Sequence, residues 1–147
     1  DINNLEEAYF YGYPGDEYVD MIGVDDYWNV GRKENNATLK EQQKNFTKVL
    51  ELVTNIADEK NKVAALTETG LEGITNPKWF SDHILDPILS SDNIKISYVL
   101  VWRNANTKHH YAPYPGHSSV KDFKKFCGHD KILLEDDLEG MYQSKTP

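Results

Sequence analysis

Cysteine, positive charge and long apolar runs are all scarce in this chain of 147 residues. Cys127 is the only cysteine, which excludes an intramolecular disulfide framework and a cysteine-rich zinc site. No segment approaches the roughly 20 apolar residues needed to cross a bilayer, and residues 1–4 lack the pattern of a signal peptide. The 16 basic residues are outnumbered by 24 acidic ones, and a net charge of −8 repels phosphate backbones and anionic lipids. We therefore expect neither nucleic acid nor a membrane as a partner.

Motifs for phosphate and for metal ions are missing as well. Gly12, Gly15 and Gly23 do not form a GxGxxG or GxxxxGK pattern, which lowers the odds of a nucleotide-binding fold. Of the five histidines, the consecutive pair His109 and His110 cannot easily face one ion, and the others show no HExxH spacing. We therefore expect no metal and no cofactor.

Three short, β-rich apolar runs cover residues 19–24, 63–67 and 94–102, and each is followed by a helical pattern. The third run is nearly continuous, which is typical of a strand covered on both faces of a parallel sheet. Alternating strands and helices of this length predict right-handed βαβ units. We expect an α/β fold in which residues 1–147 form one domain.

The helix signals between these runs are specific. Thr38 and Glu41 have the spacing of a capping box, and apolar residues then recur every three or four positions to Ala57, which predicts an amphipathic helix. Asn76 followed by proline predicts the start of a second helix. Pro87 is expected to kink or end that helix near residue 86. Its buried side is predicted to carry Trp79, Phe80, His83 and Ile84.

Polar side chains stand at the carboxyl ends of the three runs, which terminate in DDYW at 25–28, TETG at 67–70 and WRN at 102–104. In parallel α/β proteins these ends converge on one face, where substrates bind. A carboxylate, a tyrosine able to hold it by a hydrogen bond and a flat aromatic make a set typical of hydrolases. We expect one pocket to be lined by Asp25, Tyr27, Glu68, Trp102 and Arg103.

Each of these residues also has a simpler interpretation. Glu68 could be an ordinary loop acid, although a carboxylate that ends an apolar run costs desolvation unless it is paired or used. Tyr27 and Trp102 could both belong to the core. Arg103 and Asn104 could tie loops together through their hydrogen-bonding groups. The residue types alone leave these alternatives open.

Five segments in register resemble the C-terminal half of glycoside hydrolase family 26, whose members are chiefly endo-β-1,4-mannanases. These segments are YPGDEYVD at 13–20, GVDDY at 23–27, ALTETG at 65–70, VWRNA at 101–105 and YAPYPGH at 111–117. The resemblance implies the C-terminal part, about strands six to eight, of a retaining (β/α)8 TIM barrel. It places those strands at residues 19–27, 63–68 and 94–102.

The resemblance also implies roles. Glu68 matches the catalytic nucleophile and Tyr27 matches the tyrosine that orients it. The substrate-binding residues are then expected to be Asp25, Trp102, Arg103, Trp28 and Tyr114. The implied partner is a β-mannan-type polysaccharide or oligosaccharide, and the implied location is secreted, cell-surface or periplasmic.

The family's acid/base glutamate, which lies on the fourth strand, has no counterpart here, so residues 1–147 resemble a partial catalytic domain. A retaining mechanism needs two carboxyl groups about 5 to 5.5 Å apart, so the isolated chain is expected to be inactive. Its unpaired sheet edges predict self-association or pairing with the missing half. Two alternatives stay open: a relative acting on β-1,3-xylan or mixed-linkage β-glucan, and a noncatalytic carbohydrate-binding half-barrel.

Overall fold

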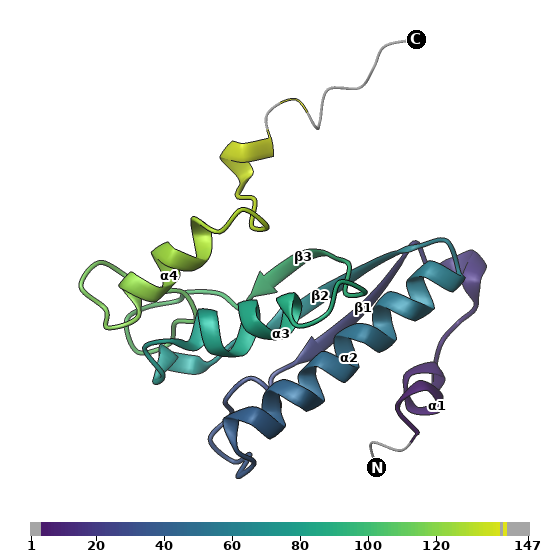
Figure 1. Ribbon diagram of the computed structural model, residues 1–147, viewed down its shortest axis with the longest axis horizontal. Helices are drawn as coiled ribbons and strands as arrows, with labels where there is room; N and C mark the ends of the chain where they lie inside the picture. Colours follow the sequence, from purple (N-terminus) through teal and green to yellow (C-terminus); the bar gives the residue numbers. More distant parts are fainter. Residues whose placement is uncertain (1–3, 139, 141–147) are drawn as a thin grey trace.

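The computed structural model describes residues 4–138 and 140, and it has three parallel strands with helices packed on one face (Figure 1). The strands β1 (Met21–Asp26), β2 (Val63–Thr69) and β3 (Ile96–Val101) lie in that order. Helix α2 (Leu39–Glu59) connects β1 to β2, and the π-helical η4 (Phe80–Leu85) with α3 (Asp86–Leu89) connects β2 to β3. The predicted α/β fold with a parallel sheet is confirmed.

The remaining elements are short and lie outside the sheet. They are α1 (Leu5–Phe10), η2 (Asp16–Tyr18), η3 (Glu72–Ile74), α4 (Val120–Cys127) and η5 (Glu135–Leu138). Within residues 4–138, no helix combines the length and the hydropathy that crossing a membrane requires.

Helix α2 begins where the capping box predicts. The Thr38 hydroxyl accepts a hydrogen bond from the Glu41 amide at 3.3 Å, and the Glu41 carboxylate accepts one from the Thr38 amide at 2.8 Å. These bonds satisfy two of the amide groups that a helix start leaves without partners. The predicted apolar stripe is fully buried at Phe46, Leu50 and Val53. Helix α2 therefore returns the chain along one face of the sheet.

The second helical segment changes where Pro87 predicts a break. The π-helix η4 ends at Leu85 and the α-helix α3 begins at Asp86. Proline is tolerated because it lies in the first turn of α3, where its missing N–H leaves no necessary bond unmade. The four residues predicted to face the core are all buried. The Trp79 indole N–H also donates to the Val30 carbonyl at 2.6 Å, which fixes the loop after β1.

The core lies between the helices and one face of the sheet. Leu66 of β2 packs in one cluster with side chains from α2 and η4, including Phe46, Leu50, Phe80 and Ile84. On β3, Ile96, Val99 and Val101 pack against this cluster. Tyr98 and Leu100 point the other way and are each 42% exposed. The prediction that this strand is covered on both faces is therefore wrong for the described residues, since the helices cover one face only.

The first strand begins two residues later than the sequence indicates. Residues 16–18 form the 3₁₀ turn η2, and the Val19 carbonyl accepts a hydrogen bond from the Lys62 amine instead of joining the sheet. Strand β1 ends at Asp26. Asp25 and Asp26 are the last residues of the strand, which agrees with their expected place at its carboxyl end, and Asp25 lies opposite Glu68 in the register of β1 and β2.

Candidate active site

Glu68 and Tyr27 meet at the carboxyl ends of β1 and β2. A register shift between Val24 and Asp25 sets Asp25 beside Glu68. From its place just after β1, Tyr27 donates a hydrogen bond from its hydroxyl to Glu68 Oε1 at 2.9 Å. Burial, followed by this hydrogen bond and the charge of Glu68, raises the pKa of Tyr27 well above its usual value. The tyrosine therefore stays a neutral donor to a half-buried carboxylate.

Asp25 has a different partner. Its Oδ1 accepts a hydrogen bond from the Thr67 hydroxyl at 2.8 Å, across the same strand pair. Gly23 makes room for Thr67, because a Cβ atom at that position would lie 2.4 Å from Thr67 Cγ2. The glycine, the threonine and the aspartate thus form a close-packed group across β1 and β2.

Tyr111 is a site residue that the strand ends alone do not predict. Its ring lies against Gly70, where an added Cβ atom would be 2.4 Å from Tyr111 Cδ1, and the glycine adopts a φ of +150°. The ring also meets Tyr27 edge-on, with centroids 6.3 Å apart. A glycine two residues after a strand-end carboxylate was the available signal, because glycine permits such a close approach.

Asn104 fixes the loop that carries Tyr111. Its side-chain oxygen accepts hydrogen bonds from the amides of Tyr111 at 2.8 Å and Ala112 at 2.9 Å, and its Nδ2 donates to the Ala112 carbonyl. The interpretation that Asn104 ties loops together is confirmed. Burial and the charges of Glu72 and Glu68 raise the pKa of Tyr111, so its hydroxyl is also a neutral donor near carboxylates.

A cavity of about 780 Å³ opens beside the two tyrosines. Two loops form it, one following β1 at residues 31–34 and one following β2 at residues 70–75. Two ion pairs lie at its rim: Arg32 Nε with Glu34 Oε2 at 3.0 Å, and His109 Nδ1 with Glu72 Oε1 at 2.7 Å. The carboxyl end of the sheet is therefore hollowed next to the Tyr27–Glu68 contact.

Trp102 and Arg103 follow β3 at the same end. The Trp102 amide donates to the Thr69 carbonyl at 2.9 Å, so its backbone is joined to the end of β2, and its side chain is 36% exposed. Trp102 is thus not a core residue in this structure. Arg103 is exposed, and no hydrogen bond or ion pair of its side chain is found within residues 4–138.

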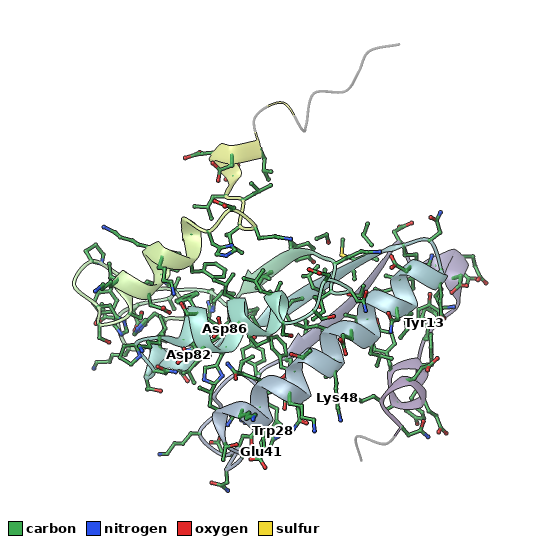
Figure 2. The ribbon with its side chains drawn as sticks, viewed as in Figure 1. Tyr13, Trp28, Glu41, Lys48, Asp82 and Asp86 are labelled. Carbon is green, nitrogen blue, oxygen red and sulfur yellow. The ribbon has the colours of Figure 1, made fainter. Side chains whose placement is uncertain are left out.

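Trp28 and Tyr114 are less closely tied to Glu68. Trp28 is 51% exposed and lies at the α2 end that carries Glu41, whereas Tyr13 lies at the opposite end (Figure 2). Tyr114 packs edge-on against His110 and His117, with ring centroids 5.1 and 5.2 Å away. The structure brings Tyr27 and Glu68 into contact, while Trp28 and Tyr114 make no hydrogen bond to either within the described part of the chain.

The histidines do not assemble a metal site in the part of the chain that the structure describes. His109 pairs with Glu72, and the ring of His110 is buried between aromatic neighbours. Over residues 4–138, no group of three or more histidine, cysteine or acidic side chains is arranged to hold an ion.

The sequence also matches a known protein family. The model of glycosyl hydrolase family 26 matches residues 1–81, more than half of the sequence. The chain belongs to this family. Among curated proteins it is similar to a mannan endo-1,4-beta-mannosidase of Bifidobacterium adolescentis, with 26% identity over 161 residues. That match covers 91% of the chain and 16% of the relative.

Solved structures of the family agree. A family 26 β-mannanase from Bacteroides ovatus is 38% identical and superposes with a TM-score of 0.76 over 95% of this chain and 38% of its own length. GH26C from a Muricauda species is 29% identical and superposes with a TM-score of 0.80, over 94% of this chain and 36% of its own length. A modular endo-β-1,4-mannanase from Cellulomonas fimi is 27% identical and superposes with a TM-score of 0.77, over 92% of this chain and 30% of its own length. The chain thus spans between about a sixth and two fifths of the length of these relatives.

Proposed function

We propose that this chain supplies the nucleophile-bearing part, about strands six to eight, of a retaining (β/α)8 glycoside hydrolase that cleaves β-1,4-mannosidic links. The hydrogen bond from Tyr27 to Glu68 carries the proposal. It holds a carboxylate by a neutral donor at the carboxyl end of a parallel strand, which is where such barrels bind substrate. The three named mannanase relatives support mannan, glucomannan or galactomannan as the substrate.

In the proposed reaction Glu68 attacks the anomeric carbon, and the bond from that carbon to the leaving oxygen breaks. A second carboxylic acid protonates the leaving oxygen, then removes a proton from the water that hydrolyses the glycosyl ester of Glu68. Tyr27 orients the attacking carboxylate. Donating a single neutral hydrogen bond leaves the Glu68 negative charge available for attack, whereas an ion pair would stabilise it more strongly.

We place the second carboxylic acid outside residues 1–147, in the part of the relatives' barrel that this chain does not span. The exposed side chains of Tyr98 and Leu100 on β3 support pairing with that part or self-association, because an uncovered apolar sheet face is stabilised by burial. The isolated chain is then expected to release no sugar. We also propose that the enzyme works outside the cytoplasm, since a polysaccharide of this size does not cross membranes.

The test is covalent trapping in the full-length enzyme. An activated 2-deoxy-2-fluoromannoside slows both steps of a retaining reaction, so the glycosyl ester accumulates and peptide mass spectrometry can locate it. We expect one label on Glu68 and none on the neighbouring acids Asp25 and Glu72. A label on another carboxylate would refute the assignment of Glu68.

Activity on mannan separates this proposal from a binding module. Release of reducing ends by the full-length protein supports hydrolysis, whereas tight mannan binding without any release would support a noncatalytic half-barrel. Running β-1,3-xylan and mixed-linkage β-glucan in parallel tests the family alternatives, because specificity reflects differences in transition-state binding.

A further inference from the structure

The loop that follows β1 determines where Tyr27 presents its hydroxyl. Its first part is fixed by Asp26, whose carboxylate accepts hydrogen bonds from the Asn29 amide at 2.9 Å and from Asn29 Nδ2 at 2.7 Å. These bonds close the start of the loop onto the end of β1. The second part of the loop, at Val30 and Gly31, is held from a different element.

The helical segment around η4 holds this second part. The indole N–H of Trp79 donates to the Val30 carbonyl at 2.6 Å, and both residues are fully buried. About one turn later, His83 lies against Gly31, where an added Cβ atom would be 3.2 Å from His83 Nε2. Gly31 adopts a φ of +94°, which favours glycine. The two side chains thus meet adjacent residues of the loop.

His83 is a buried titratable group that the chemistry proposed above does not use. It is 6% exposed, and its Nδ1 has no hydrogen-bond partner within the described part of the chain. Burial lowers the pKa of His83, and the charge of Asp82 and a hydrogen bond to the Asn29 backbone oppose this only in part. The ring is therefore neutral near pH 7. A buried nitrogen without a partner weakens the fold, so we expect the histidine to have a function that offsets this cost.

The helical segment is itself held from two sides. On another side of η4, Asp122 of α4 accepts hydrogen bonds from the Ser81 amide at 3.0 Å and from the Ser81 hydroxyl at 2.5 Å. The π-helical geometry of η4 is rare and is frequently found at functional sites. A segment fixed in this way can hold a neighbouring loop in one position, which is what a precise site requires.

We propose that His83 is a positioning residue for the hydrolysis: together with Trp79 it fixes the loop after β1, and thereby the direction in which Tyr27 donates to Glu68. His83 acts through Tyr27 and is assigned no contact with substrate. A displacement of about 1 Å at a reacting group can lower a rate by about 100-fold, so holding this loop matters for catalysis. The proposal rests on the proposed function for the reaction, whereas the contacts with the loop do not depend on it.

The first test is the kinetics of the full-length enzyme on mannan. His83→Leu removes the polar group at Gly31, and it is expected to lower kcat roughly 3- to 10-fold at unchanged KM, as the loss of one net hydrogen bond would. His83→Gln places an amide near the position of Nε2 and should restore most of the rate. His83→Asn is too short to reach Gly31 and replaces the leucine variant if that variant does not fold. A wild-type kcat in the variant without the contact would overturn the proposal.

A double-mutant cycle separates positioning from stability. Because His83 acts through Tyr27, adding His83→Leu to Tyr27→Phe should lower kcat/KM no further. A purely structural role would instead reduce the folded, active fraction equally in both backgrounds, so full additivity would overturn the proposal. Ser81→Ala is the matched control, because this serine is buried on the same π-helix but binds α4. It is expected to lower the melting temperature and to leave kcat/KM unchanged.

An NMR signal tests the same contact without turnover. The ¹³Cζ resonance of Tyr27 in the full-length protein, assigned by its loss in Tyr27→Phe, responds to the hydrogen bond with Glu68. This resonance is expected to shift in His83→Leu and to stay in place in Ser81→Ala. An unchanged resonance in His83→Leu would overturn the proposal. If the resonance shifts but the wild-type enzyme does not cleave mannan, the positioning of Tyr27 stands and the proposed function fails.

Discussion

Asp16 and Glu68, which lie at opposite ends of the sheet, are held by different kinds of partner. At the amino end, Asp16 pairs with the Lys60 amine at 2.9 Å, and Lys62 donates to the carbonyls of Asp16 and Val19. At the carboxyl end, Glu68 receives its hydrogen bond from the neutral hydroxyl of Tyr27. None of the ion pairs found within residues 4–138 includes Glu68.

This difference separates stability from chemistry. A charged partner stabilises the ionised carboxylate, which favours the folded state but weakens a nucleophile. A neutral donor fixes the orientation of the carboxylate and leaves its charge available. We therefore expect substitutions at the carboxyl end to change catalytic rate and substitutions at the amino end to change stability, and four variants test this separation.

The largest effect is expected from Glu68→Ala in the full-length enzyme. Removing the nucleophile should lower kcat on mannan by at least about 10³-fold, because no other group replaces covalent catalysis at that position. The melting temperature should change little, since Glu68 makes no ion pair within the described residues. Rate assays with parallel thermal melts measure both quantities. Wild-type turnover by the variant would contradict the role proposed for Glu68.

Tyr27→Phe should have a smaller effect of the same kind. The substitution keeps the ring that meets Tyr111 and removes one hydrogen bond to a charged group, so kcat/KM should fall about 10- to 100-fold. Because the pKa of Tyr27 is raised, its hydroxyl stays protonated at alkaline pH, and the variant should keep the wild-type alkaline limb of the pH–rate profile. A fall of less than about twofold would show that this contact does not orient the nucleophile.

Most of the fold was predictable because local signals agreed with the packing. The capping box at Thr38 and Glu41 and the apolar periodicity that follows describe α2 well, since both depend on local geometry. The start of β1 was misjudged because the Lys62 amine, distant in sequence, takes the Val19 carbonyl. Exposure of Tyr98 was misjudged for a related reason, since an apolar run cannot reveal whether anything covers its second face.

The candidate site was predictable where it depends on strand ends and not where it depends on long loops. Parallel strands bring Tyr27 and Glu68 together whatever the loops do, and the contact between them is present as expected. Tyr111 reaches the site through a loop whose path is fixed by Asn104 and by the space at Gly70. The sequence of this loop has no periodicity, so the only signal for the position of Tyr111 was the glycine, which permits a close approach.

At the amino end, Lys62→Met is expected to lower stability without lowering activity. The methionine keeps the length of the side chain but loses the charged donor to two carbonyls, which should reduce the free energy of unfolding by about 1 to 3 kcal/mol. Denaturant titration measures this loss, and kcat/KM should stay at the wild-type value. Lys95→Met is the matched control, because its exposed pair with Asp58 should contribute less than about 1 kcal/mol. A loss of activity in Lys62→Met would break the separation between the two ends.

The smallest effect is expected from Asp16→Asn, and its pH dependence is the informative part. Hydrogen bonds from Lys60 and then from Tyr13 lower the pKa of Asp16 below its ordinary value of 3.8. A carboxylate whose pKa is lower in the folded state contributes stability above its unfolded pKa and loses it as the pH falls through the folded value. The wild-type protein should therefore melt a few degrees at most above Asp16→Asn at pH 7, because the pair is solvent-exposed. This difference in melting temperature should disappear as the pH falls below 3.8. High salt should reduce the difference at pH 7 by screening the charges. Thermal melts of both proteins across this pH range measure the difference. A difference in melting temperature that grows as the pH falls would mean that Asp16 is not held as an anion at the amino end of the sheet.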